Sequence, residues 1–142
     1  IGNREMLFAK AENLLKENLL DYVAMDIKGE KEKYGRIVGF SPANDTQTQN
    51  FQIAPIEASV DIIRNSGISY EFRTTVVKEF HTMESFEKIG LWLHGSTQYF
   101  LQNFVENPNV ISPGFHSYEK EELLEFSKVL TPHFNTVSIR GI

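Results

Sequence analysis

Hydrophobic positions along the chain follow two spacings in turn, and this alternation repeats four times. Apolar residues three and four positions apart predict helices, and short apolar or aromatic runs between them predict strands. The predicted helices lie within 7–15, 56–63, 82–93 and 117–130, and the predicted strands span 22–25, 70–77, 99–104 and 137–139. Helices that alternate with strands are typical of a parallel sheet. The pattern therefore predicts an α/β fold with about four mostly parallel strands and four helices.

Residues that begin or end helices agree with these boundaries. Thr82 and Ser117 are placed to cap the third and fourth helices at their N-termini. Gly67 and Gly95 are placed to stop the second and third helices, and Pro132 follows the fourth.

The connections between the predicted elements differ in length on the two sides of the sheet. Helix-to-strand turns are short, whereas two strand-to-helix segments, 29–55 and 105–117, are long and dense in Pro, Asn, Ser and Gly. Long loops in a compact domain are usually functional or mobile, and ligands of parallel α/β folds bind where the strands end. We therefore expect the functional edge to carry Lys28, Val77 and Phe104. The charged stretch 30–33 is expected to be a solvated helical turn.

Charged residues lie near the ends of the first two strands. Asp26 and Lys28 are two positions apart, so both point to one face and could hold a polar ligand or neutralise each other at the rim. On the second strand Glu71, Arg73 and Thr75 share a face in the same way. An arginine in an apolar strand needs a partner, which here is either a ligand carboxylate or the carboxylate of Asp26 or Glu71.

The third strand ends in two amides and an aromatic ring, within the segment Leu101-Gln102-Asn103-Phe104. Amides beside an aromatic ring suit a flat heterocycle, and buried amides also commonly satisfy loop backbone. Three adjacent strands thus bring an acid–base pair, an arginine and an amide–aromatic group to one depth. This convergence predicts a ligand site at the edge of the sheet.

Composition narrows the class of protein. The 142 residues predict a single domain spanning 1–142, and the net charge of −5 speaks against a chain-wide cationic surface for nucleic acid. No stretch approaches the roughly 18 apolar residues of a membrane span, and no secretory pattern opens the sequence. We therefore predict a cytoplasmic protein without nucleic-acid or membrane partners.

The potential metal ligands are few. The chain contains no cysteine, so it alone supplies neither a disulfide nor a thiolate ligand for an iron–sulfur cluster. Its four histidines are scattered without metal-ligand spacing, and surface or capping roles are expected for His81, His94, His116 and His133. No metal ligand and no catalytic residue is assigned.

Several segments together resemble one known family. The segments Asp21–Gly29, Lys33–Gly39, Tyr70–Val77 and Ile139–Gly141 resemble, in this order, the C-terminal half of radical S-adenosylmethionine activases. Among these, the closest resemblance is to the activating protein of anaerobic ribonucleoside-triphosphate reductase and to pyruvate formate-lyase activating enzymes. The resemblance covers most of the chain and is weakest across 40–54.

The resemblance implies a fold and an activity. Such enzymes are partial (β/α) barrels of six strands, in which a [4Fe–4S] cluster reduces S-adenosylmethionine. The resulting 5′-deoxyadenosyl radical abstracts a hydrogen from a glycine of a partner enzyme, here one of the anaerobic ribonucleotide reductase or pyruvate formate-lyase type. By motif, Asp26 and Lys28 would meet the methionine or ribose part of the cofactor. Arg73 and Thr75 would line it, and Leu101, Gln102, Asn103 and Phe104 would approach the adenine.

The departures from the family pattern are equally specific. The CxxxCxxC loop that binds the cluster is missing, as is the Gly-Gly-Glu segment that holds the amino group of the cofactor. Phe104 stands where activases often carry a histidine. We therefore expect the C-terminal portion of a longer enzyme, an incomplete radical-SAM core that is inactive on its own. The alternatives are a non-catalytic α/β module that binds a nucleotide-like ligand, and an interaction protein that self-associates through an exposed sheet edge.

Overall fold

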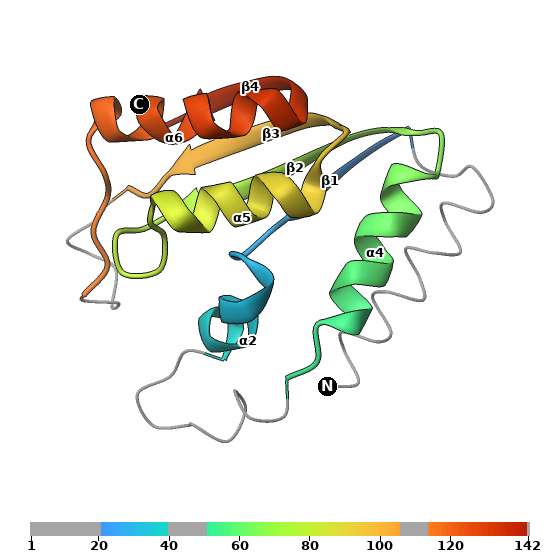
Figure 1. The fold of residues 1–142 in the computed structure, drawn as a ribbon, viewed down its shortest axis with the longest axis horizontal. Helices are drawn as coiled ribbons and strands as arrows, with labels where there is room; N and C mark the ends of the chain where they lie inside the picture. Colours follow the sequence, from blue (N-terminus) through green and yellow to red (C-terminus); the bar gives the residue numbers. More distant parts are fainter. Residues whose placement is uncertain (1–20, 40–50, 106–113, 142) are drawn as a thin grey trace.

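Four parallel strands form one open sheet in the computed structural model, which describes residues 21–39, 51–105 and 114–141. The strands β1 (Tyr22–Asp26), β2 (Ser69–Val76), β3 (Ser96–Asn103) and β4 (Phe134–Arg140) lie side by side in sequence order (Figure 1). The predicted α/β class and the four parallel strands are confirmed. An open sheet of this order is compatible with a partial barrel.

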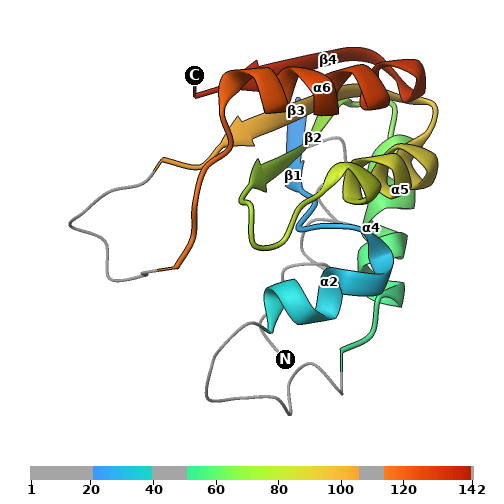
Figure 2. The same cartoon turned by 60° about the vertical axis from the view of Figure 1, so that its left-hand side comes forward.

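Helices connect successive strands and cover one face of the sheet. Figures 1 and 2 show α4 (Ala54–Arg64), α5 (Met83–Leu93) and α6 (Lys120–Leu130) on the same side of the strands. A short helix, α2 (Lys31–Val38), follows β1, and the 3-10 turn η1 (Thr131–His133) leads into β4. Parallel strands that follow one another in order, joined by right-handed crossovers, place every crossover helix on one face.

The core lies between the sheet and these helices. Phe72 of β2 and Tyr99 and Leu101 of β3 are fully buried, and they face the apolar side chains of the helices. The rings of Phe86 on α5 and Phe126 on α6 pack with centroids 4.7 Å apart. Burying large apolar side chains of this kind contributes about 1.5–3 kcal/mol each, so this layer holds the sheet in place.

The predicted elements that fall within the described residues are found with several shifted bounds. β3 begins at Ser96 instead of 99, and β4 begins at Phe134 instead of 137. The N-cap of the fourth helix is Glu119 instead of the predicted Ser117, and the helix begins at Lys120. The Glu119 N–H donates to the side chain of Glu122 at 3.3 Å. The third strand ends at Asn103, so Phe104 lies just beyond it. The segment 29–55, predicted as a loop, contains α2. The predicted helix within 7–15 lies outside the described residues.

The expectation for 30–33 is wrong in one respect. The stretch does open a helix, but Glu30 is only 1% exposed instead of solvated. Lys33 lies 3.9 Å from the Glu30 carboxylate, which places a compensating charge on the solvent side.

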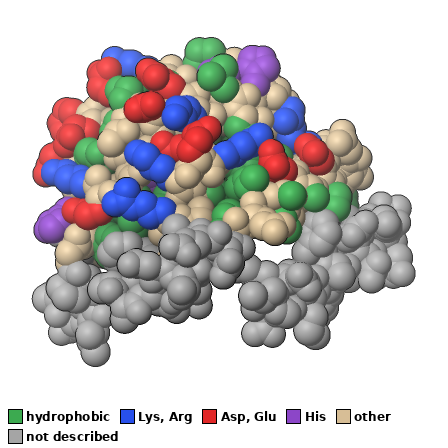
Figure 3. Space-filling view, turned by 60° about the horizontal axis from the view of Figure 1, so that its bottom comes forward, with side chains coloured by type: hydrophobic (Ala, Val, Ile, Leu, Met, Phe, Trp, Pro, Cys, Tyr) green, Lys and Arg blue, Asp and Glu red, His purple; other side chains and the backbone are tan. Residues whose placement is uncertain are grey.

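The surface carries charges of both signs. Lysine, arginine and acidic side chains are interspersed over the face shown in Figure 3. Among the described residues, no helix is long and apolar enough to cross a membrane. The outer strands of the sheet are β1 and β4, and self-association through a sheet edge stays a prediction.

Candidate functional site

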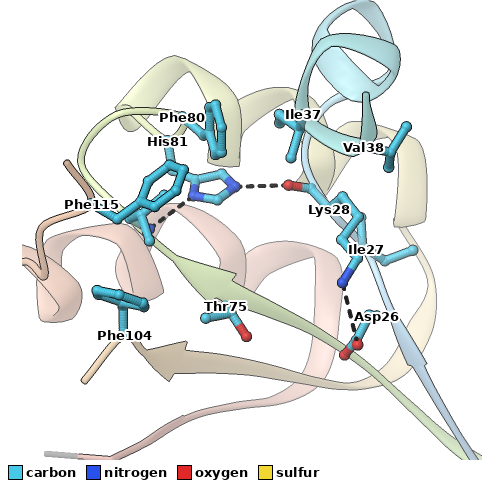
Figure 4. Close-up of a pocket in the computed structure, with 11 residues that line it drawn as sticks. Asp26, Ile27, Lys28, Ile37, Val38, Thr75, Phe80, His81, Phe104 and Phe115 are labelled. Carbon is cyan, nitrogen blue, oxygen red and sulfur yellow. Dashed lines mark hydrogen bonds and ion pairs between the residues drawn. The ribbon is translucent and has the colours of Figure 1, made fainter. Parts of the chain in front are cut away.

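The carboxyl ends of β1, β2 and β3 surround an open pocket of about 380 Å³ (Figure 4). Lys28, Val77 and Phe104, the three residues expected to mark the functional edge, all line it. Pockets of about 300–1,000 Å³ are typical of small-molecule sites, so this hollow is at the lower end of that range. The complete lining comprises Asp26, Ile27, Lys28, Ile37, Val38, Thr75, Val77, Phe80, His81, Phe104 and Phe115.

One wall of the pocket is polar and is centred on Asp26. The Arg73 Nε donates a hydrogen bond of 2.6 Å to Asp26 Oδ1, and the Lys28 ammonium lies 3.6 Å from Oδ2. This hydrogen bond and the charge of Asp26 raise the pKa of Arg73 above its ordinary value. Two cations share one carboxylate, which leaves a net positive charge for an anionic ligand group. Thr75 is exposed beside them.

The partner of Arg73 in the structure is Asp26, one of the alternatives left open by the sequence. Asp26 and Arg73 are aligned in the register of β1 and β2, so their side chains start from neighbouring positions on one face. Among the described residues Arg73 bonds only Asp26, and it does so through Nε. Its two terminal nitrogens make no hydrogen bond to the described residues, and Arg73 lies beside the pocket without being one of its lining residues.

The other wall of the pocket is aromatic. The ring of Phe115 packs against Phe80 with centroids 5.3 Å apart and against Phe104 at 6.4 Å (Figure 4). The three rings come from segments that follow β2, follow β3 and precede α6, which all meet at this edge. An aromatic wall opposite charged groups suits a ligand with a flat heterocycle at one end and charged groups at the other.

His81 joins the two strand ends beneath the pocket, and the surface or capping role expected for it is wrong. It is 1% exposed, and its Nδ1 accepts a hydrogen bond of 3.0 Å from the Val77 N–H. The proton therefore sits on Nε2, which donates to the Lys28 carbonyl at 2.8 Å. Burial lowers the pKa of His81, outweighing its backbone hydrogen bonds and the nearby Glu30. A neutral imidazole thus fixes the end of β1 against the turn after β2.

The predicted residues of β3 occupy different places. The side chain of Leu101 is fully buried in the core, on the side of the helices, while Gln102 is aligned with Thr75 and Arg140 of the neighbouring strands. Asn103 donates from Nδ2 to the Gly141 carbonyl at 3.3 Å. Its Oδ1 is buried and has no hydrogen-bond partner in the structure. Such an acceptor is costly unless a donor reaches it. Leu101, Gln102 and Asn103 are not among the residues that line the pocket, whereas Phe104 is.

The sheet face opposite the helices carries a second polar network. The Arg140 guanidinium binds the carboxylate of Glu71 through two hydrogen bonds of 3.0 and 3.2 Å, and the Tyr22 hydroxyl donates to it at 2.6 Å. The guanidinium lies 3.5 Å from the ring centroid of Phe100. Burial alone would raise the pKa of Glu71, but the bonds from Tyr22 and Arg140 and the arginine charge hold it below its usual value.

Sequence reasoning gave no role in the site to six lining residues, which are Ile27, Ile37, Val38, Phe80, His81 and Phe115. Phe115 lies in the long segment 105–117, which was expected to be functional, so the loop length was a usable signal. Phe80 and His81 lie in the turn after β2, which is short and carries no such signal.

The donor set of the chain does not fit an iron–sulfur cluster. The sequence contains no cysteine, and within the described residues no group of three or more His, Cys, Asp and Glu side chains is placed to hold a metal ion. The pocket groups do fit an organic ligand with charged and heterocyclic parts, because Asp26, Lys28 and the three aromatic rings face one hollow.

Fold and pocket together define a parallel α/β fold with a pocket at the carboxyl ends of its strands. The chain is similar to a protein of Methanocaldococcus jannaschii whose name places it among the glycyl-radical enzyme activating enzymes. The two are 28% identical over 134 residues, which cover 92% of this chain and 53% of the relative. The chain therefore spans about half the length of that curated relative. No family model matches the chain, and no solved structure matches it.

Proposed function

We propose that this chain forms the C-terminal wall of the S-adenosylmethionine pocket of a radical enzyme that activates a glycyl-radical enzyme. The observation that carries the proposal is the two-sided pocket, in which Asp26, Lys28 and Thr75 oppose Phe80, Phe104 and Phe115. The name of the distant relative, together with the motif resemblance, supports this activity over other uses of the fold. The target enzyme is then one of the anaerobic ribonucleotide reductase or pyruvate formate-lyase type.

Each pocket group has a role in this proposal that follows from its chemistry. The free nitrogens of Arg73 and the Lys28 ammonium bind the carboxylate of the methionine part, or with Asp26 the ribose hydroxyls. The aromatic wall packs against the adenine, and Asn103 Oδ1 accepts a hydrogen bond from its amino group. Gln102 and Thr75 complete the polar side, and Leu101 supports it from the core.

The chemistry of the cofactor is divided between this chain and the rest of the enzyme. In such enzymes bound S-adenosylmethionine, together with a [4Fe–4S] cluster, is the source of the radical that reaches the glycine of the partner. This chain has no cysteine to bind the cluster, so its residues orient the cofactor and exclude water from one side. Cluster binding belongs to residues outside this sequence.

The test is ligand binding by the ¹⁵N-labelled chain, followed by NMR. S-adenosylmethionine is expected to shift the amide signals of Lys28, Thr75 and Phe104, weakly because one wall of a pocket is poorly preorganised. Arg73→Gln and Asp26→Asn are each expected to weaken binding about tenfold, which is a loss of about 1.4 kcal/mol. Lys128→Gln on α6, whose side chain is 71% exposed, is the matched control and leaves binding unchanged.

Two outcomes would count against the proposal. No shift at the pocket with millimolar S-adenosylmethionine would remove its basis. Equal shifts with adenosine alone and no effect of Arg73→Gln would favour the non-catalytic module for a nucleotide-like ligand.

A further inference from the structure

Two histidine side chains meet at the end of the sheet opposite the pocket. His94 follows the last residue of α5, and His133 is the last residue of η1, just before β4. Their Nδ1 atoms are 2.8 Å apart, and the planes of their rings are inclined at 79°. At this distance the two nitrogens form a hydrogen bond in which one Nδ1 carries the proton and the other accepts it, so both rings present a nitrogen to the same small space.

The backbone on both sides holds these rings in place. The Arg64 Nη2 donates to the His94 carbonyl at 2.7 Å, and the Gly95 N–H donates to the His133 carbonyl at 2.9 Å. The ring of His133 lies directly on Gly90, where an added Cβ would be 2.4 Å from His133 Cδ2. The absence of a side chain at Gly90 therefore lets the His133 ring approach α5 closely. A site whose ligands are fixed before binding loses less conformational entropy when an ion arrives.

We propose that His94 and His133 form a binding site for a divalent transition-metal ion that accepts ligands at right angles, Ni²⁺ or Cu²⁺. Imidazole nitrogen is a preferred ligand of these ions. Two bonds of about 2.05 Å to nitrogens 2.8 Å apart enclose an angle of about 86°, close to neighbouring positions of a square-planar or octahedral ion. A tetrahedral ion needs the two nitrogens farther apart, so the spacing favours Ni²⁺ and Cu²⁺ over Zn²⁺.

Water molecules supply the remaining ligands of the ion. Within the described residues no group of three or more potential ligand side chains is found, so the ion is held by two imidazoles and by solvent. Burial, together with the neighbouring His94, lowers the pKa of His133, so its ring is neutral and able to bind a metal near pH 7. The charged group bonded to this corner is Arg64, which donates to the backbone carbonyl of His94 and not to its ring.

The ion would have a structural effect. It would tie the end of α5 to the start of β4, which are 39 positions apart in sequence. Because the unfolded chain does not hold the two rings together, binding stabilises the folded state in proportion to the logarithm of the ion concentration.

The experiment measures Ni²⁺ binding to the chain without an affinity tag, by calorimetry at pH 7.5, with Mg²⁺ as the ion that should not bind. One Ni²⁺ per chain is expected. A free Ni²⁺ concentration of ten times the dissociation constant is expected to raise the melting temperature by about 4 °C. His94→Gln and His133→Gln are each expected to weaken binding by at least about tenfold, since even outer-shell partners of metal ligands are worth about 10–100-fold.

His116→Gln is the matched control, because His116 is also exposed but pairs with Glu79 elsewhere. It is expected to leave Ni²⁺ affinity unchanged. The proposal is overturned if His94→Gln binds Ni²⁺ as tightly as the original chain, if binding disappears in His116→Gln instead, or if no saturable binding occurs. Imidazole NMR signals of His94 and His133 that respond to Ni²⁺ while the fold is intact would confirm the location.

Discussion

Replacing Arg140 by methionine is expected to lower the free energy of unfolding by about 3 kcal/mol at pH 7. The side chain of Glu71 is only 5% exposed, and the two hydrogen bonds of Arg140 compensate its charge. Methionine keeps much of the packing over Phe100 but leaves the carboxylate buried with the Tyr22 hydroxyl as its remaining donor. Removing one partner of a buried ion pair is costly because the other charge stays buried without compensation.

The pH dependence of this loss follows from the pKa of Glu71. The folded state holds this pKa below its ordinary value of about 4.3. The ion pair therefore stabilises the protein above that pH, and the stabilisation is lost as the pH falls through the folded value. Urea unfolding at pH 7 and pH 4 is the measurement. The difference between the original chain and Arg140→Met should be largest at pH 7 and should shrink toward pH 4, because protonating Glu71 removes the charge that needs a cation.

Two further variants separate the ion pair from a general effect of the substitution. Lys128→Met removes an exposed lysine charge whose ion pair with Glu125 is open to solvent. It is expected to change stability by less than about 0.5 kcal/mol. Glu71→Leu combined with Arg140→Met removes both charges and is expected to recover most of the loss. If the double variant is no more stable than Arg140→Met, the buried charge is not the cause.

The fold could be predicted from sequence to the extent that burial dictates residue type. All four strands were located because the sheet face under the helices needs apolar side chains at alternate positions, as Tyr70, Phe72 and Val76 show in β2. Only the first turn of α2 was expected, because four of its eight residues, KEKYGRIV, are charged and few are apolar. It is held instead by Tyr34, which is 2% exposed and stacks on Phe51, a contact between distant segments that local periodicity does not contain.

The sequence predicted the edge of the sheet at which the candidate site lies better than it predicted the residues that form the site. Strand direction alone placed Asp26, Lys28 and Thr75 at one end of the sheet, and the pocket lies there. The pairing of Arg73 needed the register, which aligns it with Asp26, whereas Glu71 bonds an arginine 69 positions away. Neither distance nor register can be read from spacing within a strand.

Replacing His81 by phenylalanine is expected to lower the free energy of unfolding by about 3 kcal/mol at pH 7.5. The ring keeps its size, but the Val77 N–H and the Lys28 carbonyl each lose a buried partner, at about 1–3 kcal/mol each. The end of β1 would no longer be fixed to the turn after β2, so the Asp26–Lys28 wall would also bind ligand less well.

The protonation of His81 gives this prediction a second measurable part. Burial lowers the pKa of His81 below 6.5 in the folded state. As the pH falls, His81 is therefore protonated first in the unfolded chain. The stability due to neutral His81 is lost as the pH falls from 6.5 toward the folded value. Urea unfolding at pH 7.5 and 5.5 should therefore show a smaller gap between His81→Phe and the original chain at pH 5.5. His81→Gln, whose amide can still donate to the Lys28 carbonyl, should lose less stability than phenylalanine at pH 7.5 and show the same reduced pH dependence. Equal stability of all three proteins at pH 7.5 would mean that the two hydrogen bonds do not hold the strand ends together.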